Sequence, residues 1–228
     1  MKNCLLSSGT VQPSESMLTI SFLSLSGGLQ DAYTYIERAG VFANAQTGNI
    51  VLLSANILEG NRGKILHYLI PLIFFSLGVM AAEMIRTHFR EDGRLSWQQA
   101  VLVCEICLLF TVGLLPSGIT VLANAIVSFA CAMQVQTFRK IEGCSFSSTM
   151  CIGDLRSGVE ALYSWHSTKN REALRKAVRY FGVILFFAAG AGIGAFGVPY
   201  LGVHTIWASC ALLTICFILM FFRRDTGK

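Results

Sequence analysis

Residues 26–33 read SGGLQDAY and residues 40–49 read GVFANAQTGN, and these two stretches interrupt sequence that is otherwise apolar. They bring an acid, several amides and several glycines into one short region. Hydrophobic residues make up 54% of the chain and charged residues 14%, whereas a soluble domain carries about 25% charged residues. This number of charged residues is too small to cover the surface of a folded chain. We therefore expect lipid to cover part of that surface. The composition predicts an all-α, polytopic membrane helix bundle that forms a single membrane domain over residues 1–228.

The apolar runs differ in length and polarity. Two of them, residues 44–58 and 147–165, are too short or too polar to cross a bilayer core of about 30 Å comfortably. We therefore predict about six spans and two short re-entrant or half helices. The six long runs lie at residues 17–36, 65–85, 97–115, 119–138, 180–196 and 204–222.

The order long, short, long, long occurs twice along the chain. A shift of 105 residues places Gly48 on Gly153 and Asn49 on Asp154. This pattern predicts a duplication, with repeat one at about 17–116 and repeat two at about 119–222; the alternative is chance similarity among apolar residues. Three spans in each repeat would give the halves opposite orientations. Such inverted repeats are a recurring design of channels and secondary transporters.

The distribution of Lys and Arg discriminates between two topologies. If all eight segments cross the membrane, eleven basic residues lie inside and six outside, and the two halves are parallel. If the short segments enter the membrane and return, fifteen lie inside and three outside. The second topology obeys the positive-inside rule much better. It places both termini in the cytoplasm and the uncharged turns at 116–118 and 198–202 outside.

The first candidate site lies around the opening of the first short segment. A charge such as Asp31 at membrane depth costs at least about 2.5 kcal/mol. Asp31 is interpreted either as a proton, cation or substrate site, or as a carboxylate that lies at the outer membrane interface or caps nearby backbone. Asn44, Thr47, Gly48 and Asn49 open a short helix whose free N–H groups favour an anion or a carbonyl oxygen. Capping by Thr47 or an Asn explains part of this cluster, but leaves further amides to explain.

The second candidate site lies in the second half of the chain. Gly153 and Asp154 lie in the second short segment, and Gln134 or Gln136 is expected beside them.

Glu105, in the first half, stands alone in a long apolar stretch, so it is expected to face the interior of the bundle, to be protonated, or to be paired. The two short segments are predicted to meet near the membrane midplane, with these residues forming the two halves of one site.

Other chemistries find no support in the sequence. Cysteines within apolar runs, such as Cys131, are interpreted as small hydrophobic residues. The pair Cys104-x-x-Cys107 has no second pair at metal spacing, and the histidines are scattered. We expect no metal, no cofactor and no enzyme activity. Basic residues lie in connections between apolar segments, which argues against a nucleic-acid partner. The expected partners are the lipid bilayer and an unknown small solute or ion, and a homo-oligomer is left open.

The polar stretches resemble the YoaK-like family, multi-spanning bacterial membrane proteins that form a domain of unknown function. The resemblance lies in GGxxDA at 27–32 and GVFxNxxTGN at 40–49. A second Thr-Gly is expected in the other half, but residues 152–154 read IGD there. The resemblance implies a bacterial inner-membrane protein and carries no established activity.

Three hypotheses for the function follow. The first is a small-solute or ion transporter or channel, and the alternative is a scaffold or accessory protein whose polar residues only hold helices together. The third is an intramembrane enzyme acting on a lipid or a quinone. Clustering of the candidate residues around one site favours transport, whereas bonds to neighbouring backbone favour a scaffold.

Overall fold

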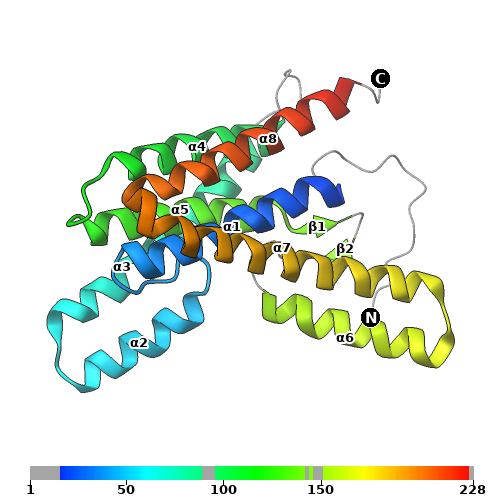
Figure 1. The fold of residues 1–228 in the computed structure, drawn as a ribbon, viewed down its shortest axis with the longest axis horizontal. Coiled ribbons are helices and arrows are strands. Elements are labelled where there is room, and N and C mark those ends of the chain that lie inside the picture. The colour runs from blue at the N-terminus through cyan, green and yellow to red at the C-terminus, as the bar shows by residue number, and fades with distance from the viewer. Residues whose placement is uncertain (1–15, 89–95, 142–143, 146–150, 226–228) are drawn as a thin grey trace.

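The computed structural model describes residues 16–88, 96–141, 144–145 and 151–225, which are almost entirely helical (Figure 1). Short connections join the helices, and one small hairpin lies between α5 and α6. The helices are α1 (Met17–Glu37), α2 (Gln46–Leu58), α3 (Arg62–His88), α4 (Trp97–Leu114), α5 (Thr120–Thr137), α6 (Cys151–Thr168), α7 (Arg171–Leu201), the 3-10 helix η2 (Gly202–Thr205) and α8 (Ile206–Asp225). The hairpin strands are β1 (Lys140–Ile141) and β2 (Cys144–Ser145), which the all-α prediction did not include.

Four described stretches are long and apolar enough to cross a membrane, judged by length and composition. They are Arg62–His88, Trp97–Leu114, Thr120–Thr137 and Arg171–Phe222, the last of which comprises α7, η2 and most of α8. The polar residues of α1 lower its hydropathy. They need not meet lipid, because α5, α7 and α8 pack around this helix and bury one residue after another along it.

The helix α7 is longer at both ends than the predicted run 180–196. It has 31 residues and begins at Arg171, so the basic residues before 180 extend the helix. The predicted turn at 198–202 is wrong, because the helix continues through Pro199 to Leu201. Pro199 lacks a backbone N–H and so removes one helical hydrogen bond, but only two residues of α7 follow it. The chain turns at Gly202, whose φ of 52° is accessible to glycine at low cost.

Three helices run in the same direction through the bundle: α1, α4 and α7. Residues further along α1 contact residues further along each of the other two. The contacting pairs are Leu25–Gly190 and Leu29–Gly194 for α1 with α7, and Gln30–Glu105 and Arg38–Leu115 for α1 with α4.

The helices α3, α5 and α8 run in the opposite direction. The helix α1 is antiparallel to α5 and α8, because residues later in α1 contact residues earlier in those two helices. The helix α3 is parallel to α5, because residues later in α3 contact residues later in α5. The pairs are Leu23–Gln134 and Arg38–Asn124 for α1 with α5, Thr19–Cys216 and Ser26–Ser209 for α1 with α8, and Gly78–Phe129 and Glu83–Gln136 for α3 with α5.

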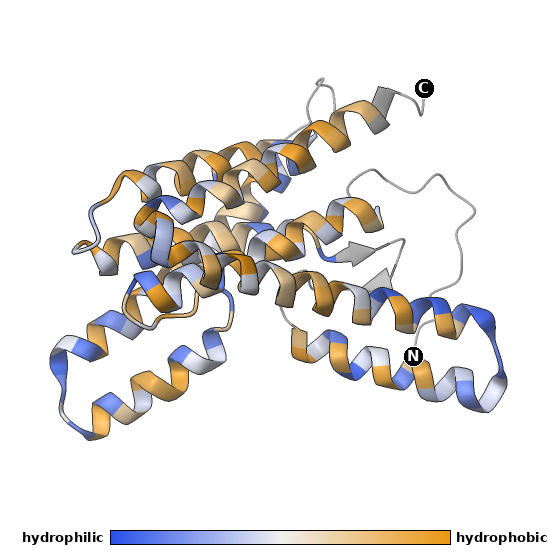
Figure 2. Cartoon of the chain, in the orientation of Figure 1, coloured by the Kyte–Doolittle hydropathy of each residue, from blue (hydrophilic) through white to orange (hydrophobic). Residues whose placement is uncertain are grey.

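The shorter helices α2 and α6 lie beside this bundle. Each packs against the helix that follows it, α2 against α3 and α6 against α7, and Figure 1 shows these two hairpins at opposite sides of the view. The α6–α7 turn is hydrophilic, whereas the middle of α8 is hydrophobic (Figure 2). The connection between α6 and α7 is therefore suited to water, and the face of the bundle to lipid.

Glycines allow α1 and α7 to pack in close contact. A Cβ atom added to Gly190 would overlap the carbonyl oxygen of Leu25, and one added to Gly28 would overlap the carbonyl oxygen of Phe187. A Cβ on Gly194 would lie 2.9 Å from the Leu29 carbonyl oxygen. Gly190 and Gly194 are four residues apart, a spacing that places both on the helix face that meets α1 and permits this close approach.

The substitution Gly190→Ala is expected to lower the stability of the folded protein by about 1–3 kcal/mol, because the new methyl group requires α1 and α7 to separate. Gly192→Ala is the matched control, since a Cβ at that position meets nothing within 4 Å. It should leave stability unchanged or raise it slightly, because alanine favours a helix over glycine by about 1 kcal/mol. Thermal unfolding of both variants in detergent tests this. Equal melting temperatures would contradict the close packing.

Candidate functional site

Asp31 connects α1 to the loop that precedes α2. Its side chain is buried, and its Oδ1 accepts a hydrogen bond from the backbone N–H of Asn44 at 2.7 Å. The Asn44 side chain returns to α1 by donating from Nδ2 to the carbonyl oxygen of Gly27 at 3.2 Å. These two bonds hold the loop against α1. The Oδ1 atom of Asn44 is buried and has no hydrogen-bond partner among the described residues.

Asn49 fixes the loop from the other side. Its Oδ1 accepts from the Phe42 backbone N–H at 3.1 Å, and its Nδ2 donates to the Phe42 carbonyl oxygen at 2.6 Å and to Gln46 Oε1 at 2.8 Å. A single amide thus satisfies both backbone groups of Phe42. Asn49 is fully buried, and its described bonds all remain within residues 42–49.

Thr47 and Gly48 have simpler roles. The residue that caps α2 is Ala45, whose side chain makes no capping bond, and Thr47 is exposed. The prediction that Thr47 caps this helix is therefore wrong. Gly48 allows the Phe42 ring to lie against α2, since a Cβ there would be 3.1 Å from a ring carbon.

Glu105 belongs to a buried polar cluster that is centred on Gln30. The Glu105 side chain is 0% exposed, as predicted for a residue facing the bundle interior. Gln30 Nε2 lies 3.3 Å from Glu105 Oε1, 3.0 Å from Ser26 Oγ and 2.9 Å from Ser209 Oγ. The two serine hydroxyls are 2.5 Å apart. The cluster joins α1, α4 and α8, and Glu105 Oε2 has no partner among the described residues.

Cys131 of α5 links this cluster to the loop before α2. Its thiol donates to Gln30 Oε1 at 2.6 Å and also contacts the Asn44 side chain. The interpretation of Cys131 as a purely apolar residue is therefore wrong. The groups around Asp31 and Glu105 form one connected arrangement instead of two separate ones.

Buried polar side chains continue along one face of α5. Asn124 Nδ2 donates to the Arg38 carbonyl oxygen at 2.7 Å, and Gln134 Nε2 donates to the Leu23 carbonyl oxygen at 3.1 Å. Ser128, between them, lies 3.5 Å from Gln46 Nε2. The spacing of three or four residues keeps these side chains on one helix face. We call the following set the polar track: Gln30, Asn44, Glu105, Asn124, Ser128, Cys131 and Gln134.

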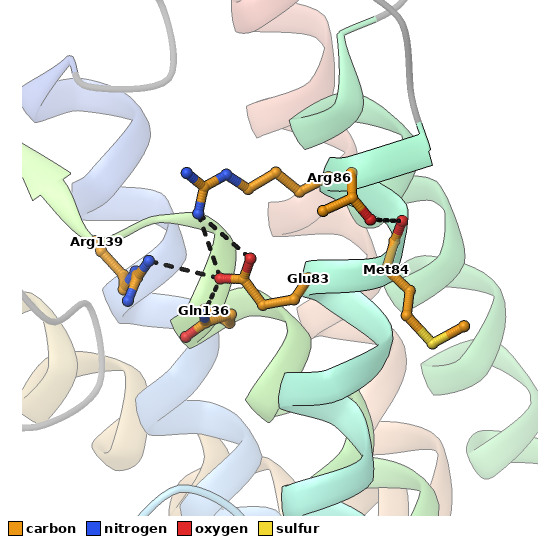
Figure 3. A network of polar contacts seen from close by, with 6 residues as sticks. Glu83, Met84, Arg86, Gln136 and Arg139 are labelled. Atoms are coloured by element: carbon orange, nitrogen blue, oxygen red, sulfur yellow. Dashed lines mark hydrogen bonds and ion pairs between the residues drawn. The ribbon is translucent and has the colours of Figure 1, made fainter.

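Gln136 is outside the polar track. It donates a hydrogen bond to Glu83, which also lies 3.3 Å from Arg86 and 3.6 Å from Arg139 (Figure 3). This group joins the ends of α3 and α5. Of the two glutamines offered for the second half of the site, Gln134 alone lies in the bundle interior, whereas Gln136 belongs to a network at a helix end.

The two site residues predicted in the second short segment differ in their surroundings. Asp154 is buried in the first turn of α6, whereas Gly153 faces open space. Cys151, the first residue of α6, lies within electrostatic range of both Asp31 and Asp154. The beginning of α6 therefore approaches the region around Asp31. Residues 147–150 of the predicted segment lie outside the described residues.

Arg38 is an important residue that charge counting misassigned to a solvated connection. Its side chain is 0% exposed. The guanidinium donates to the Val112, Leu115 and Pro116 carbonyl oxygens at 3.2, 2.9 and 2.7 Å, and to the Tyr33 hydroxyl at 2.9 Å. The last carbonyls of a helix lack partners and attract a cation, so Arg38 caps the end of α4.

Some of the site residues that were not predicted had a recognisable sequence signal, and others had none. Gln30 and Ser26 belong to the polar stretch 26–33 and could have been selected with Asp31. Ser209 is a single hydroxyl in an apolar run, and its partners lie far away in sequence. No group of three or more His, Cys, Asp or Glu side chains suited to a metal ion occurs in the part of the chain that the structure describes.

Comparison with known proteins identifies the class of molecule. Residues 19–219 match a family model described as a protein of unknown function, DUF1275. The UPF0700 transmembrane protein YoaK of Bacillus subtilis (strain 168) is 26% identical over 203 residues, which cover 85% of this chain and 89% of that protein. No solved structure matches. The expected resemblance is confirmed, and the apolar helices and the transmembrane relative together support a multi-pass membrane protein.

Replacing Arg38 by Gln is expected to destabilise the protein strongly, because each buried carbonyl that loses its donor costs about 1–3 kcal/mol. Arg62→Gln is the control, since that arginine is exposed at the start of α3. Thermal unfolding in detergent should show a large fall for the first variant and little change for the second. Similar melting temperatures would contradict the capping role.

Proposed function

We propose that this chain, which belongs to the DUF1275 family of proteins of unknown function, is a small-solute or ion transporter or channel of the bacterial inner membrane. The observation that carries this proposal is the polar track. Side chains of α1, α4 and α5 and of the loop before α2 meet in the interior of a membrane bundle, where polar groups are expensive and usually mark a pathway.

The helix directions support six crossings. Along the chain α1, α3, α4, α5, α7 and α8 alternate in direction, as expected if α2 and α6 return to the side from which they start. An even number of crossings leaves both termini on one side. The distribution of Lys and Arg favours the cytoplasm for that side.

The same directions support an inverted repeat. The corresponding helices α1 and α5, α3 and α7, and α4 and α8 run in opposite directions. Their partners also exchange: α1 packs against α7 as α5 packs against α3, and α2 packs against α3 as α6 packs against α7. This exchange supports a pseudo-two-fold relation between residues 17–116 and 119–222.

Within this proposal the candidate residues have different roles. Glu105, Asn44 and Gln134 present buried polar atoms to the pathway. Asp31 positions Asn44. Asn49, with Gly48 beside it, shapes the loop, and Asp154 would contribute from the start of α6.

A scaffold or accessory protein is the second candidate function, and one observation favours it. Asp31 and Asn49 bond to backbone groups of the loop before α2, which is the arrangement expected of residues that only hold the structure together. A measurement of solute passage discriminates between the two functions.

Transport is tested by the swelling of proteoliposomes in isosmotic sugars, amino acids and salts, followed by light scattering. At least one of these solutes should enter faster than into protein-free vesicles. Asp31→Asn keeps an acceptor for the Asn44 N–H but replaces a charge-assisted hydrogen bond by a weaker neutral one, so Asn44 is held less firmly. We expect its rate to fall by about tenfold or more.

Glu59→Gln is the control for that variant, because Glu59 is an exposed carboxylate at the end of α2. It should leave the rate unchanged. If none of the solutes enters faster than into empty vesicles, the scaffold function is favoured.

The inverted arrangement predicts opposite accessibility for the two short helices. In a cysteine-free background, Thr47→Cys should react with a membrane-impermeant maleimide from outside, and Ile152→Cys from inside. Both positions are exposed on the protein surface, so burial does not block either reaction. Labelling of both positions from the same side would rule out the inverted topology.

A further inference from the structure

The polar track has unpaired atoms of one chemical kind. Glu105 Oε2, Asn44 Oδ1, Asn124 Oδ1 and Gln134 Oε1 are all buried, and none has a donor among the described residues. Their side chains are 0%, 3%, 0% and 0% exposed. All four atoms are oxygens that accept hydrogen bonds or coordinate cations.

The orientation of the three amides is fixed by their other contacts. Asn44 Nδ2, Asn124 Nδ2 and Gln134 Nε2 face the carbonyl oxygens of Gly27, Arg38 and Leu23. A carbonyl oxygen only accepts, so the amide nitrogen has to face it and the amide oxygen has to be the vacant atom. Rotating any of these amides would place two acceptors against each other.

No cationic side chain compensates these oxygens in the part of the chain that the structure describes. The described ion pairs of carboxylates involve Glu83 and Glu160. The buried guanidinium of Arg38 is directed to Tyr33 and to the end of α4. A proton on Glu105 Oε2 would neutralise the carboxylate but would leave that atom as a donor without a partner, so the missing hydrogen bond would not be supplied.

We infer that the polar track binds a small monovalent cation, a metal ion or a protonated amine, at the vacant carboxylate oxygen of Glu105, with the vacant amide oxygens of Asn44, Asn124 and Gln134 as further acceptors along the track. Oxygen atoms are the ligands that hard metal ions prefer, and they also accept from ammonium N–H groups. The inference rests on the proposed function and names the class of solute.

This class differs from the anion that the start of a short helix would favour. The Asn44 N–H is already bound by Asp31, and the Gly48 N–H by the Ala45 carbonyl oxygen. An anion in the polar track would meet vacant acceptors, which repel it.

Cation binding is tested by thermal unfolding of the whole purified protein in detergent. Chlorides of sodium, potassium and methylammonium are compared with N-methyl-D-glucamine chloride at equal ionic strength. At least one of the small cations should raise the melting temperature in a saturable manner, because a ligand that binds the folded state stabilises it. A shift with methylammonium alone assigns an amine, and a shift with sodium or potassium assigns a metal ion.

Glu105→Gln is the decisive variant. Its amide oxygen can keep the bond from Gln30 while its NH₂ group replaces the vacant acceptor by a donor, so the cation-dependent shift should disappear. Glu160→Gln, at an exposed carboxylate of α6, is the matched control and should retain the shift. Retention of the full shift in Glu105→Gln would overturn the inference.

The wild-type comparison decides the matter by itself if Glu105→Gln does not fold. Equal melting temperatures in all four chlorides would overturn cation binding. Stabilisation by a neutral solute or by a change of anion, in place of the cation, would overturn it too. Solute entry in the swelling assay without any cation-dependent shift would leave transport standing and remove the cation. A shift without solute entry would leave the cation site and remove transport.

Discussion

The arrangement of the bundle depends on the requirement that α1 be surrounded by protein. This helix carries Gln30 and Asp31 and leads directly to Arg38, and lipid could satisfy none of these side chains. Three helices therefore enclose α1: α7 through glycine contacts, α8 through Ser209, and α5 through its polar face. The more apolar helix α3 lies further out. Of its most apolar 18 residues 22% are buried, compared with 67% for α5.

The enclosure of α1 also explains why the polar groups form one connected set. Side chains from α4, α5 and α8 reach α1 from different directions, and Gln30 uses both ends of its amide to join them. Because a buried amide has to satisfy its N–H groups, each contact restricts where the neighbouring helix lies. The oxygens left without partners cannot rotate toward another donor, because the other atoms of the same side chains are already bonded. They therefore indicate where a ligand could bind.

Hydropathy was sufficient to place α1, α4 and α5 to within one or two residues, because each of these helices ends where an apolar run ends. It failed at α7, where charges in the first turns mark a change of surroundings but leave the helix intact. It also failed for Arg38, because counting charges does not reveal that the end of α4 supplies carbonyl partners. In the candidate site, Asp31 and Glu105 were recognisable as isolated acids. The roles of Cys131 and Ser209 depend on a partner, Gln30, that lies 101 and 179 residues away from them, which no local pattern can indicate.

The cap that Arg38 places on α4 has a consequence for how the molecule can move. Its partners are carbonyl oxygens and a tyrosine hydroxyl, none of which is a carboxylate. Added salt therefore offers no direct way to open this junction. The ends of α1 and α4 that meet at Arg38 are expected to move together. If access to the interior alternates between the two sides of the membrane, the displacement has to arise where other helices move against this pair.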